Sequence, residues 1–539
     1  MTRSTIFRPR FAAAWALALG AVFAGAVSTA GAAEGPAAKV AVTIRADQPG
    51  EVINPNVYGQ FAEHLGAGIY EGVWVGEKSN IPNTNGFRND VIQALKNLKV
   101  PVVRWPGGCF ADEYHWRDGV GDRAKRPVKV NTHWGGVAET NEFGTHEFMA
   151  FAEMIGTKVY ISGNVGSGSP QEMADWMEYM TSNTVSTLAN ERRKNGRDQP
   201  WEVHFFGVGN ETWGCGGNMT PEYYANLFRQ YATYVKAPRG HRPKIVASGG
   251  HDEQTEWVDV LTRNVHRDMD AISHHYYTLP TGVWQNKGNA VGFPETEWIS
   301  TLANTMRIDE YITKNVKILE ERDPQNRTAL YVDEWGTWYD PEPGREPGFL
   351  YQQNSLRDAL VAGLNFNIFH RHARRVQMTN IAQMVNVLQA MILTDGSKMA
   401  LTPTYHAFQM YIPFQGATVL PAEIETPNYA LGKYAVPSVS VSAARDTLGN
   451  LQLALVNLDP KREAAVTVRV TGAQPKGGAP TTATPSTAMG RVLTASAMDA
   501  HNTPDQPQLV APAKISAKKS GGALVLTLPP MSVSVVQMK

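Results

Sequence analysis

The chain contains only two cysteines among its 539 residues. Two cysteines form at most one disulfide, which cannot stabilise a chain of this length, so a packed core has to do so. An excess of charge of either sign is also missing, because 50 basic and 50 acidic residues cancel. Nothing in this balance indicates nucleic acid or an anionic membrane as a partner, whereas a neutral partner such as a sugar is compatible with it.

Long apolar runs are absent beyond the N-terminal segment, so no later stretch is expected to cross a bilayer. The N-terminal segment has Arg3, Arg8 and Arg10, followed by an apolar run over residues 11–27 and then by small residues. This order is typical of a secretory signal peptide, so residues 1–33 are predicted to be removed, leaving a secreted or periplasmic protein with no membrane attachment. A membrane anchor is the alternative, but the apolar run is short and dominated by Ala and Gly.

The sequence also lacks the glycine fingerprint that opens a helix in a dinucleotide site. Between residues 57 and 401, short apolar strands alternate with amphipathic helices, which predicts a parallel α/β sheet. Polar, Gly-rich strand ends favour a closed (β/α)8 TIM barrel over an open doubly wound sheet, which stays the alternative. The clearest elements are six strands at residues 100–104, 159–164, 203–210, 244–249, 271–277 and 329–334, and helices at residues 90–98 and 359–368.

A second domain is predicted over residues 402–539. Its sequence has alternating strands separated by turn residues and no convincing helix, which indicates a β-sandwich. A further alternating strand at residues 38–47 stands outside the barrel pattern. We therefore expect residues 34–56 to pack with the C-terminal sandwich and to tie the two chain ends together.

Two glutamates stand in similar settings at the ends of predicted barrel strands. Glu211 follows VHFFGVGN and Glu334 follows TALYVD. Because the carboxyl ends of the strands meet at one end of a barrel, the two side chains are expected to lie close together. A carboxylic acid and a carboxylate roughly 5 Å apart are what retaining cleavage of a glycosidic bond requires.

The neighbours of the two glutamates suggest different roles. Asn210 precedes Glu211, and its amide could bond a sugar hydroxyl next to the anomeric carbon, so Glu211 is expected to be the acid/base. Glu334, at the end of an apolar strand, is then expected to be the nucleophile. A lone glutamate in such a place is more often a salt-bridged or strand-capping carboxylate. The paired setting is what favours catalysis.

Seven motifs in order along the chain carry a family resemblance. They are YGQFAEHLG, VRWPGGCFADEYHWRDGVG, NTHWGG, FGVGNETWGCGGN, HHYYTLP, VDEWGTWY and NVLQAMILT. From about residue 40 to its end, the sequence resembles the α-L-arabinofuranosidases of glycoside hydrolase family 51. The resemblance implies a (β/α)8 barrel with a jelly-roll-like sandwich, hydrolysis with retention, and no metal or organic cofactor. It places the acid/base at the end of the fourth barrel strand and the nucleophile at the end of the seventh, which match Glu211 and Glu334.

The same resemblance implies a set of substrate-binding residues. Around the furanose ring it places Glu63, Asn210, His275, Tyr277 and Gln389. Trp134 and Trp338 match aromatic positions on the leaving-group side. The implied substrates are terminal arabinofuranosyl units of arabinoxylan, arabinan and derived oligosaccharides, and the implied assembly is a homo-oligomer, often a hexamer.

Cys109 stands where many members of the family carry an asparagine that meets a sugar hydroxyl. A thiol is a weak donor, so this contact with substrate is expected to be weaker. Cys215 follows Glu211 closely in sequence, so both cysteines are expected near one pocket. A disulfide between them and two free buried thiols are equally compatible with the sequence.

Other readings stay open or are set aside. The alternative functions are an endo-glucanase or xylosidase on the same barrel, and a carbohydrate-binding protein without catalysis.

No metal is expected, because zinc-site spacing is missing both at His274 and His275 and in the HRH sequence at residues 370–372. The few arginines at residues 371–375 are too small a cluster for a nucleic-acid surface.

Overall fold

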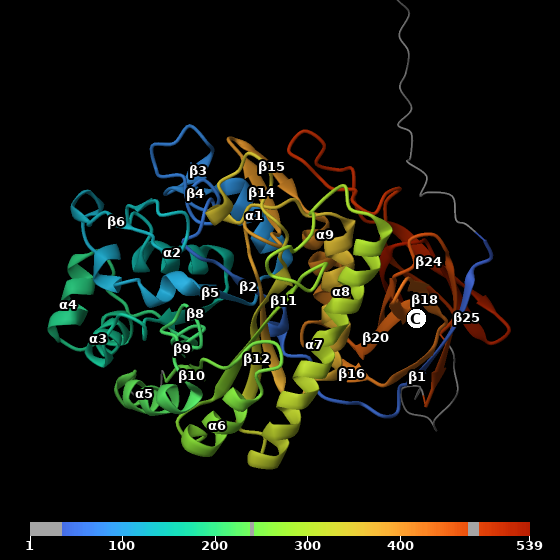
Figure 1. Ribbon diagram of the computed structural model, residues 1–539, viewed down its shortest axis with the longest axis horizontal. Coiled ribbons are helices and arrows are strands. Elements are labelled where there is room, and N and C mark those ends of the chain that lie inside the picture. Colours follow the sequence, from blue (N-terminus) through green and yellow to red (C-terminus); the bar gives the residue numbers. More distant parts are fainter. Residues whose placement is uncertain (1–34, 238–241, 473–484) are drawn as a thin grey trace, which may run out of the picture.

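Figure 1 shows the computed structural model, which describes residues 35–237, 242–472 and 485–539. The predicted signal peptide, residues 1–33, lies outside the described residues. A barrel surrounded by helices occupies one side of the molecule, and a domain rich in strands lies against α7 and α8 on the other (Figure 1). Within the described ranges, no helix combines the length and the apolar character that a membrane crossing requires.

Eight parallel strands form the barrel in chain order, and the eighth pairs with the first to close it. The predicted (β/α)8 barrel is therefore confirmed. The strands are β2 (Gly59–Phe61), β5 (Val102–Trp105), β8 (Lys158–Gly163), β9 (Phe205–Val208), β10 (Lys244–Ala247), β11 (Ala271–Thr278), β12 (Ala329–Thr337) and β13 (Val376–Ile381).

Helices cover the outside of the barrel, and three of them start with a clear sequence signal. Ser169, Thr220 and Thr402 each precede a proline, and each side-chain hydroxyl accepts a hydrogen bond from a backbone N–H of the first turn. The helices are α1 (Asn89–Leu98), α2 (Thr145–Ile155), α3 (Pro170–Thr181), α4 (Thr187–Lys194), α5 (Pro221–Tyr234), α6 (Glu256–Val265), α7 (Glu295–Arg322), α8 (Leu356–Arg371) and α9 (Pro403–Tyr411).

Two barrel strands, β2 and β13, are not among the six strands that the sequence predicted clearly. Strand β2 has only three residues, too few for any periodic signal. Strand β13 contains Thr379 and Asn380, which are polar yet fully buried, because both side chains donate hydrogen bonds to backbone carbonyls at the start of the barrel. The sequence pattern of β13 therefore resembles a loop.

The C-terminal domain is a two-layered β structure. Residues 513–517 of β24 pair with β23 and residues 518–520 pair with β25, so this strand passes from one layer to the other. Strand β1 lies between β22 and β17, far from its neighbours in sequence. The strands are β1 (Ala38–Arg45), β16 (Thr418–Leu420), β17 (Ala422–Glu425), β20 (Val439–Arg445), β21 (Leu451–Asn457), β22 (Ala464–Thr471), β23 (Ala488–Leu493), β24 (Ala513–Ser520), β25 (Ala523–Leu528) and β26 (Ser532–Met538).

Helix α9 begins at Pro403, just past residue 401, where the barrel was predicted to end. Helix α9 contacts α8 and α1, so it fills the last position in the helical layer around the barrel (Figure 1). Its nine residues are too few to give a strong helical period, and the Thr-Pro start was the signal that could have revealed it.

The described residues also contain four two-stranded pairs: β3 (Asn83–Thr84) with β4 (Phe87–Arg88), β6 (Lys129–Val130) with β7 (Ala138–Glu139), β14 (Ile392–Asp395) with β15 (Lys398–Leu401), and β18 (Asn428–Leu431) with β19 (Tyr434–Pro437).

Candidate active site

The two glutamates lie at the carboxyl end of the barrel. Glu334 is within β12, the seventh strand, and Glu211 follows β9, the fourth. Glu211 has a φ of 42°, a left-handed conformation that is costly for a residue with a side chain. The backbone N–H groups of Gly214 and Gly216 donate to its carbonyl oxygen at 2.7 and 3.1 Å, which holds this conformation in place.

The carboxylates of Glu211 and Glu334 face each other across His275. One oxygen of each and one ring nitrogen of His275 lie within 4.8 Å of one another. Retaining glycosidases hold their two carboxyl groups about 5–5.5 Å apart, whereas inverting enzymes separate them by about 6.5–9.5 Å to admit a water molecule. The arrangement therefore fits direct attack by one carboxylate on the sugar.

Glu334 is buried and held from two sides. Arg104 Nη1 donates to its Oε1 at 2.8 Å, and the hydroxyl of Tyr277 donates to its Oε2 at 2.9 Å. Burial raises the pKa of Glu334, and the positive charges of His275 and Arg104 oppose that rise. These donors fix the carboxylate in one orientation, as a nucleophile requires.

His275 connects the two carboxylates to a third. Its Nδ1 lies 2.8 Å from Glu211 Oε1 and 3.5 Å from Glu334 Oε2, and its Nε2 lies 3.1 Å from Asp333 Oδ1. Burial alone would lower the pKa of His275, but the charge of Glu334 and the bonds to Asp333 and Glu211 raise it to about 10. The ring is thus an imidazolium that donates from both nitrogens.

Changing Tyr277 to Phe tests the support of Glu334. Loss of a hydrogen bond to a charged group costs about 1.5–3 kcal/mol, so kcat/KM is expected to fall roughly 10- to 100-fold without loss of folding. Steady-state kinetics on an aryl glycoside measure this. The matched control is Tyr429→Phe, which removes a tyrosine–glutamate bond of 3.0 Å to Glu295 elsewhere in the chain and should leave kcat/KM unchanged. An equal loss in both variants would contradict the role of Tyr277.

Arg104 and Asp333 contact the residues around the two glutamates and were not among the predicted site residues. Arg104 is only 2% exposed, and besides Glu334 it donates through Nη2 to Asn210 Oδ1. This bond occupies the amide oxygen of Asn210. The amide nitrogen is buried and has no partner among the described residues, so it remains available as a donor. Asp333 accepts from Tyr160 at 2.7 Å and from His275. The available signal was a charged residue within each of two barrel strands.

Glu63 lies near Glu334, with most of its bonding capacity already used. Its Oε1 accepts from the backbone N–H of Gly108 and Phe110 and from Trp134 Nε1, each at 3.0 Å, and its Oε2 accepts from Gln383 at 3.0 Å. Burial first, and then the nearby charge of Glu334, raise the pKa of Glu63 to about 7. Gln383 was not predicted.

Gln389, which the resemblance placed at the sugar, is not brought into the pocket. Its side chain is fully buried, Oε1 accepts from the backbone of Thr337 at 2.9 Å, and Nε2 donates to the carbonyl of Asp358 at 2.8 Å. Both ends of the amide are therefore bound to protein. The pocket-lining glutamine of this loop is Gln383.

Two adjoining cavities open at this end of the barrel. The inner one, of about 70 Å³, and the outer one, of about 280 Å³, are both lined by Glu211, Tyr277 and Trp338. Glu334 lines only the inner cavity. Of the other predicted residues, Glu63, Cys109 and Trp134 line the inner cavity and His275 lines the outer one, whereas Asn210 and Gln389 line neither.

The two cysteines form a disulfide, one of the two states that the sequence left open. Cys109 starts the 3-10 helix η2 (Cys109–Asp112), and Cys215 lies in the loop that carries Glu211. The disulfide therefore joins the loop after β5, whose backbone N–H groups bind Glu63, to the loop that carries Glu211.

Comparisons with known proteins identify the family. The family described as "Alpha-L-arabinofuranosidase 1 domain" matches residues 94–290, and "Alpha-L-arabinofuranosidase C-terminal domain" matches residues 333–532. An "Intracellular exo-alpha-L-arabinofuranosidase" of Bacteroides ovatus is 46% identical over 92% of this chain and 95% of its own. The chain belongs to the α-L-arabinofuranosidases of glycoside hydrolase family 51. The crystal structure of the family 51 arabinofuranosidase from Xanthomonas axonopodis pv. citri superposes with a TM-score of 0.90 at 55% identity, covering 93% of this chain and 100% of that one. "Alpha-L-arabinofuranosidase C" of Emericella nidulans is 32% identical over 78% of this chain and 85% of its own.

Membership of the family confirms the predicted enzyme class. This arabinofuranosidase is a glycoside hydrolase that removes terminal arabinofuranosyl residues, and arabinose-containing glycans are its substrates. The alternatives of an endo-glucanase, a xylosidase or a sugar-binding protein without catalysis are set aside.

The expected location of this arabinofuranosidase was wrong. A secreted or periplasmic protein was predicted, but the Bacteroides ovatus relative, which matches 92% of the chain, is named as intracellular. The prediction rested on arginines followed by a short apolar run. This pattern covers only a few residues and depends on their composition alone, so it is weaker evidence for the location of the protein than a relative matched over 500 residues.

Proposed function

We propose that this enzyme hydrolyses arabinofuranosides by double displacement with retention, using Glu334 as the nucleophile and Glu211 as the acid/base. The observation that carries the proposal is that one oxygen of each carboxylate lies within 4.8 Å of the other, closer than the roughly 6.5–9.5 Å that inverting enzymes keep between their carboxyl groups. Glu334 lines only the inner cavity, which would hold the arabinofuranosyl ring, whereas Glu211 lines both cavities, as a group that protonates the bond between them has to do.

In the first step, Glu334 attacks the anomeric carbon and Glu211 protonates the departing oxygen. His275 occupies Glu211 Oε1, so Oε2 is the atom that would carry this proton. The bond to Glu334 forms as the glycosidic bond breaks, and the leaving alcohol departs through the outer cavity.

In the second step, the same Glu211, now ionised, takes a proton from water, which attacks the anomeric carbon and releases Glu334. Arg104 and Tyr277 then receive the returning carboxylate charge with the hydrogen bonds seen in the free enzyme. Neither donor has to move, which limits the reorganisation during the reaction.

The substrate-binding roles are part of the same proposal. The amide nitrogen of Asn210 would donate to a hydroxyl of the sugar; the support is that this buried nitrogen has no partner among the described residues. Glu63 would accept from sugar hydroxyls at the closed end of the inner cavity. Trp134 and Trp338 would shape the way to it, with Trp338 packed edge-on against Tyr277 at 5.0 Å between ring centres. Arabinan and arabinoxylan side chains are the proposed polymers, and a hexamer is proposed from the resemblance alone.

The stereochemistry of the first product tests the mechanism. Arabino-oligosaccharides are incubated with the enzyme in an NMR tube, and the anomeric signals are followed before mutarotation. We expect free α-L-arabinofuranose as the first product, and methyl α-L-arabinofuranoside when methanol is present. First appearance of the β anomer would show a single displacement and would refute the role given to Glu334.

A further inference from the structure

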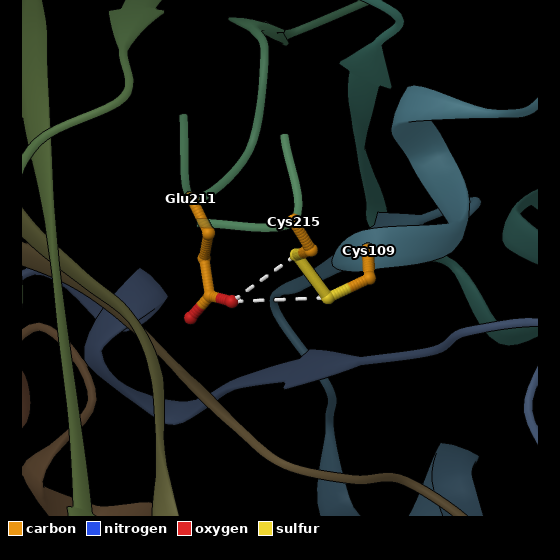
Figure 2. Close-up of side chains that lie close together, drawn as sticks. All are labelled: Cys109, Glu211 and Cys215. Carbon is orange, nitrogen blue, oxygen red and sulfur yellow. Dashed lines mark hydrogen bonds between the residues drawn. A yellow bond between two sulfur atoms is a disulfide. The ribbon is translucent and has the colours of Figure 1, made fainter. Parts of the chain in front are cut away.

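Two sulfur atoms and one carboxylate oxygen meet at the edge of the inner cavity (Figure 2). Glu211 Oε2 lies 3.9 Å from Cys109 Sγ and 3.5 Å from Cys215 Sγ. Disulfide sulfurs carry no hydrogen, so these are contacts rather than hydrogen bonds. No nitrogen or oxygen atom in the described parts of the chain bonds Oε2, although Oε1 is bound by His275. The carboxylate thus points one unsatisfied oxygen at the sulfurs.

The spacing of these atoms is close to that of a zinc site. Tetrahedral zinc binds thiolate at about 2.3 Å and carboxylate oxygen at about 2.0 Å, which places sulfur and oxygen ligands about 3.5 Å apart. The two sulfur–oxygen distances are already 3.5 and 3.9 Å, and the three ligand atoms all lie within 4.8 Å of one another. Only the two sulfurs have to separate, to roughly 3.8 Å.

The backbone allows this separation. The Cα atoms of Cys109 and Cys215 are 5.4 Å apart, so rotation about the Cα–Cβ bonds can move the sulfurs apart while the loops stay in place. All three side chains are partly exposed. A reductant and a cation can therefore both reach them.

We propose that reduction of the Cys109–Cys215 disulfide creates a Zn²⁺ site formed by Cys109, Cys215 and Glu211, with water as the fourth ligand. A dithiol or phosphine reductant supplies two electrons, the sulfur–sulfur bond breaks, and each sulfur takes up one proton. The dithiol becomes a disulfide, or the phosphine takes an oxygen from water. Zn²⁺ then displaces both thiol protons and bonds the two thiolates and Oε2.

Zinc binding would also switch off protonation of the leaving group. The ion occupies Oε2, the oxygen to which we assign the transferred proton, so this consequence rests on the proposed role of Glu211. The oxidised enzyme offers no thiolates and should be insensitive to the same zinc concentration. The state of one disulfide would thus decide whether zinc inhibits the enzyme.

The first experiment compares the two redox states of the unmodified protein. One sample is reduced with a phosphine, which is then removed without air, and both samples are titrated with zinc chloride by calorimetry. We expect one Zn²⁺ per chain in the reduced protein and none at this affinity in the oxidised one. Co²⁺ in place of zinc should give the absorption of thiolate-to-metal charge transfer. Equal zinc binding by the two states would overturn the proposal, and no substitution is needed to see it.

Variants identify the ligands. Glu211→Gln should weaken zinc binding by about tenfold or more, and Cys215→Ser should weaken it further. The matched control is Glu222→Gln, which removes an exposed carboxylate on α5 and should bind zinc as the unmodified chain does. Circular dichroism verifies that the reduced proteins remain folded. Unchanged affinity in Glu211→Gln would remove Glu211 from the site and overturn the proposal.

Activity separates this inference from the proposed mechanism. With zinc, the reduced enzyme should hydrolyse oligosaccharides about 100-fold more slowly, and a chelator should restore the rate. Zinc binding that depends on both cysteines and Glu211 but leaves hydrolysis unchanged would support the site and overturn the role of Glu211 as acid.

Discussion

Replacing Glu334 with alanine is expected to lower kcat by roughly 10⁴-fold or more on every arabinofuranoside, because no other group can form the glycosyl-enzyme. Arg104 and Tyr277 would keep their positions and leave a cavity with donors directed at its centre. Azide should enter this cavity and attack the anomeric carbon directly. The expected product is β-L-arabinofuranosyl azide, which NMR identifies, since one displacement inverts the configuration.

Two controls accompany this variant. Glu334→Gln keeps the size and the hydrogen-bonding capacity of the side chain, and it should be as inactive as the alanine variant but should not be rescued by azide. Glu222→Ala, on the exposed face of α5, should retain the full rate. Substantial activity of Glu334→Ala without azide would assign the nucleophile to another residue.

Replacing Glu211 with alanine should have effects that depend on the leaving group. For oligosaccharides, whose leaving alcohol needs a proton, kcat/KM should fall about 10²- to 10⁴-fold. For a dinitrophenyl arabinofuranoside, which departs as an anion, formation of the glycosyl-enzyme should be nearly normal and its hydrolysis slow. A rapid burst of the phenolate followed by a slow steady state is the expected time course in a stopped-flow measurement.

Azide distinguishes this variant from the first. It should attack the glycosyl-enzyme of Glu211→Ala without help from a base, raise the steady-state rate, and give α-L-arabinofuranosyl azide, because two displacements restore the configuration. Loss of the burst on the dinitrophenyl substrate, equal to the loss on oligosaccharides, would refute the assignment of Glu211 as acid/base.

The sequence carried enough information for the fold and for the positions of the two glutamates, and the reason is visible in particular residues. Glu211 comes after β9 and Glu334 lies within β12, and both strands have strong apolar patterns, so the places of the two glutamates in the barrel could be predicted. Strands β2 and β13 could not be read with the same clarity, because the first is short and the second buries polar side chains that bond the backbone.

The residues around Glu211 and Glu334 could not be predicted in the same way, because their positions depend on contacts in the folded chain. Arg104 lies within a predicted strand, but its function follows from its bonds to Glu334 and Asn210, residues far away in the sequence. Gln383 and Gln389 belong to one loop, and only the folded backbone decides which of them faces the pocket and which one bonds Thr337. The disulfide likewise depended on how two loops meet, which spacing along the chain does not encode.

The position of β1 has a consequence for biosynthesis. Domains usually fold in the order in which they leave the ribosome. Here β1 emerges first, but its partners β17 and β22 are made only after the whole barrel. The nascent chain therefore carries an unpaired apolar strand ahead of the barrel throughout translation of the barrel, which makes this segment a natural target for chaperones. The last domain to be completed thus has to recover the first strand that was made.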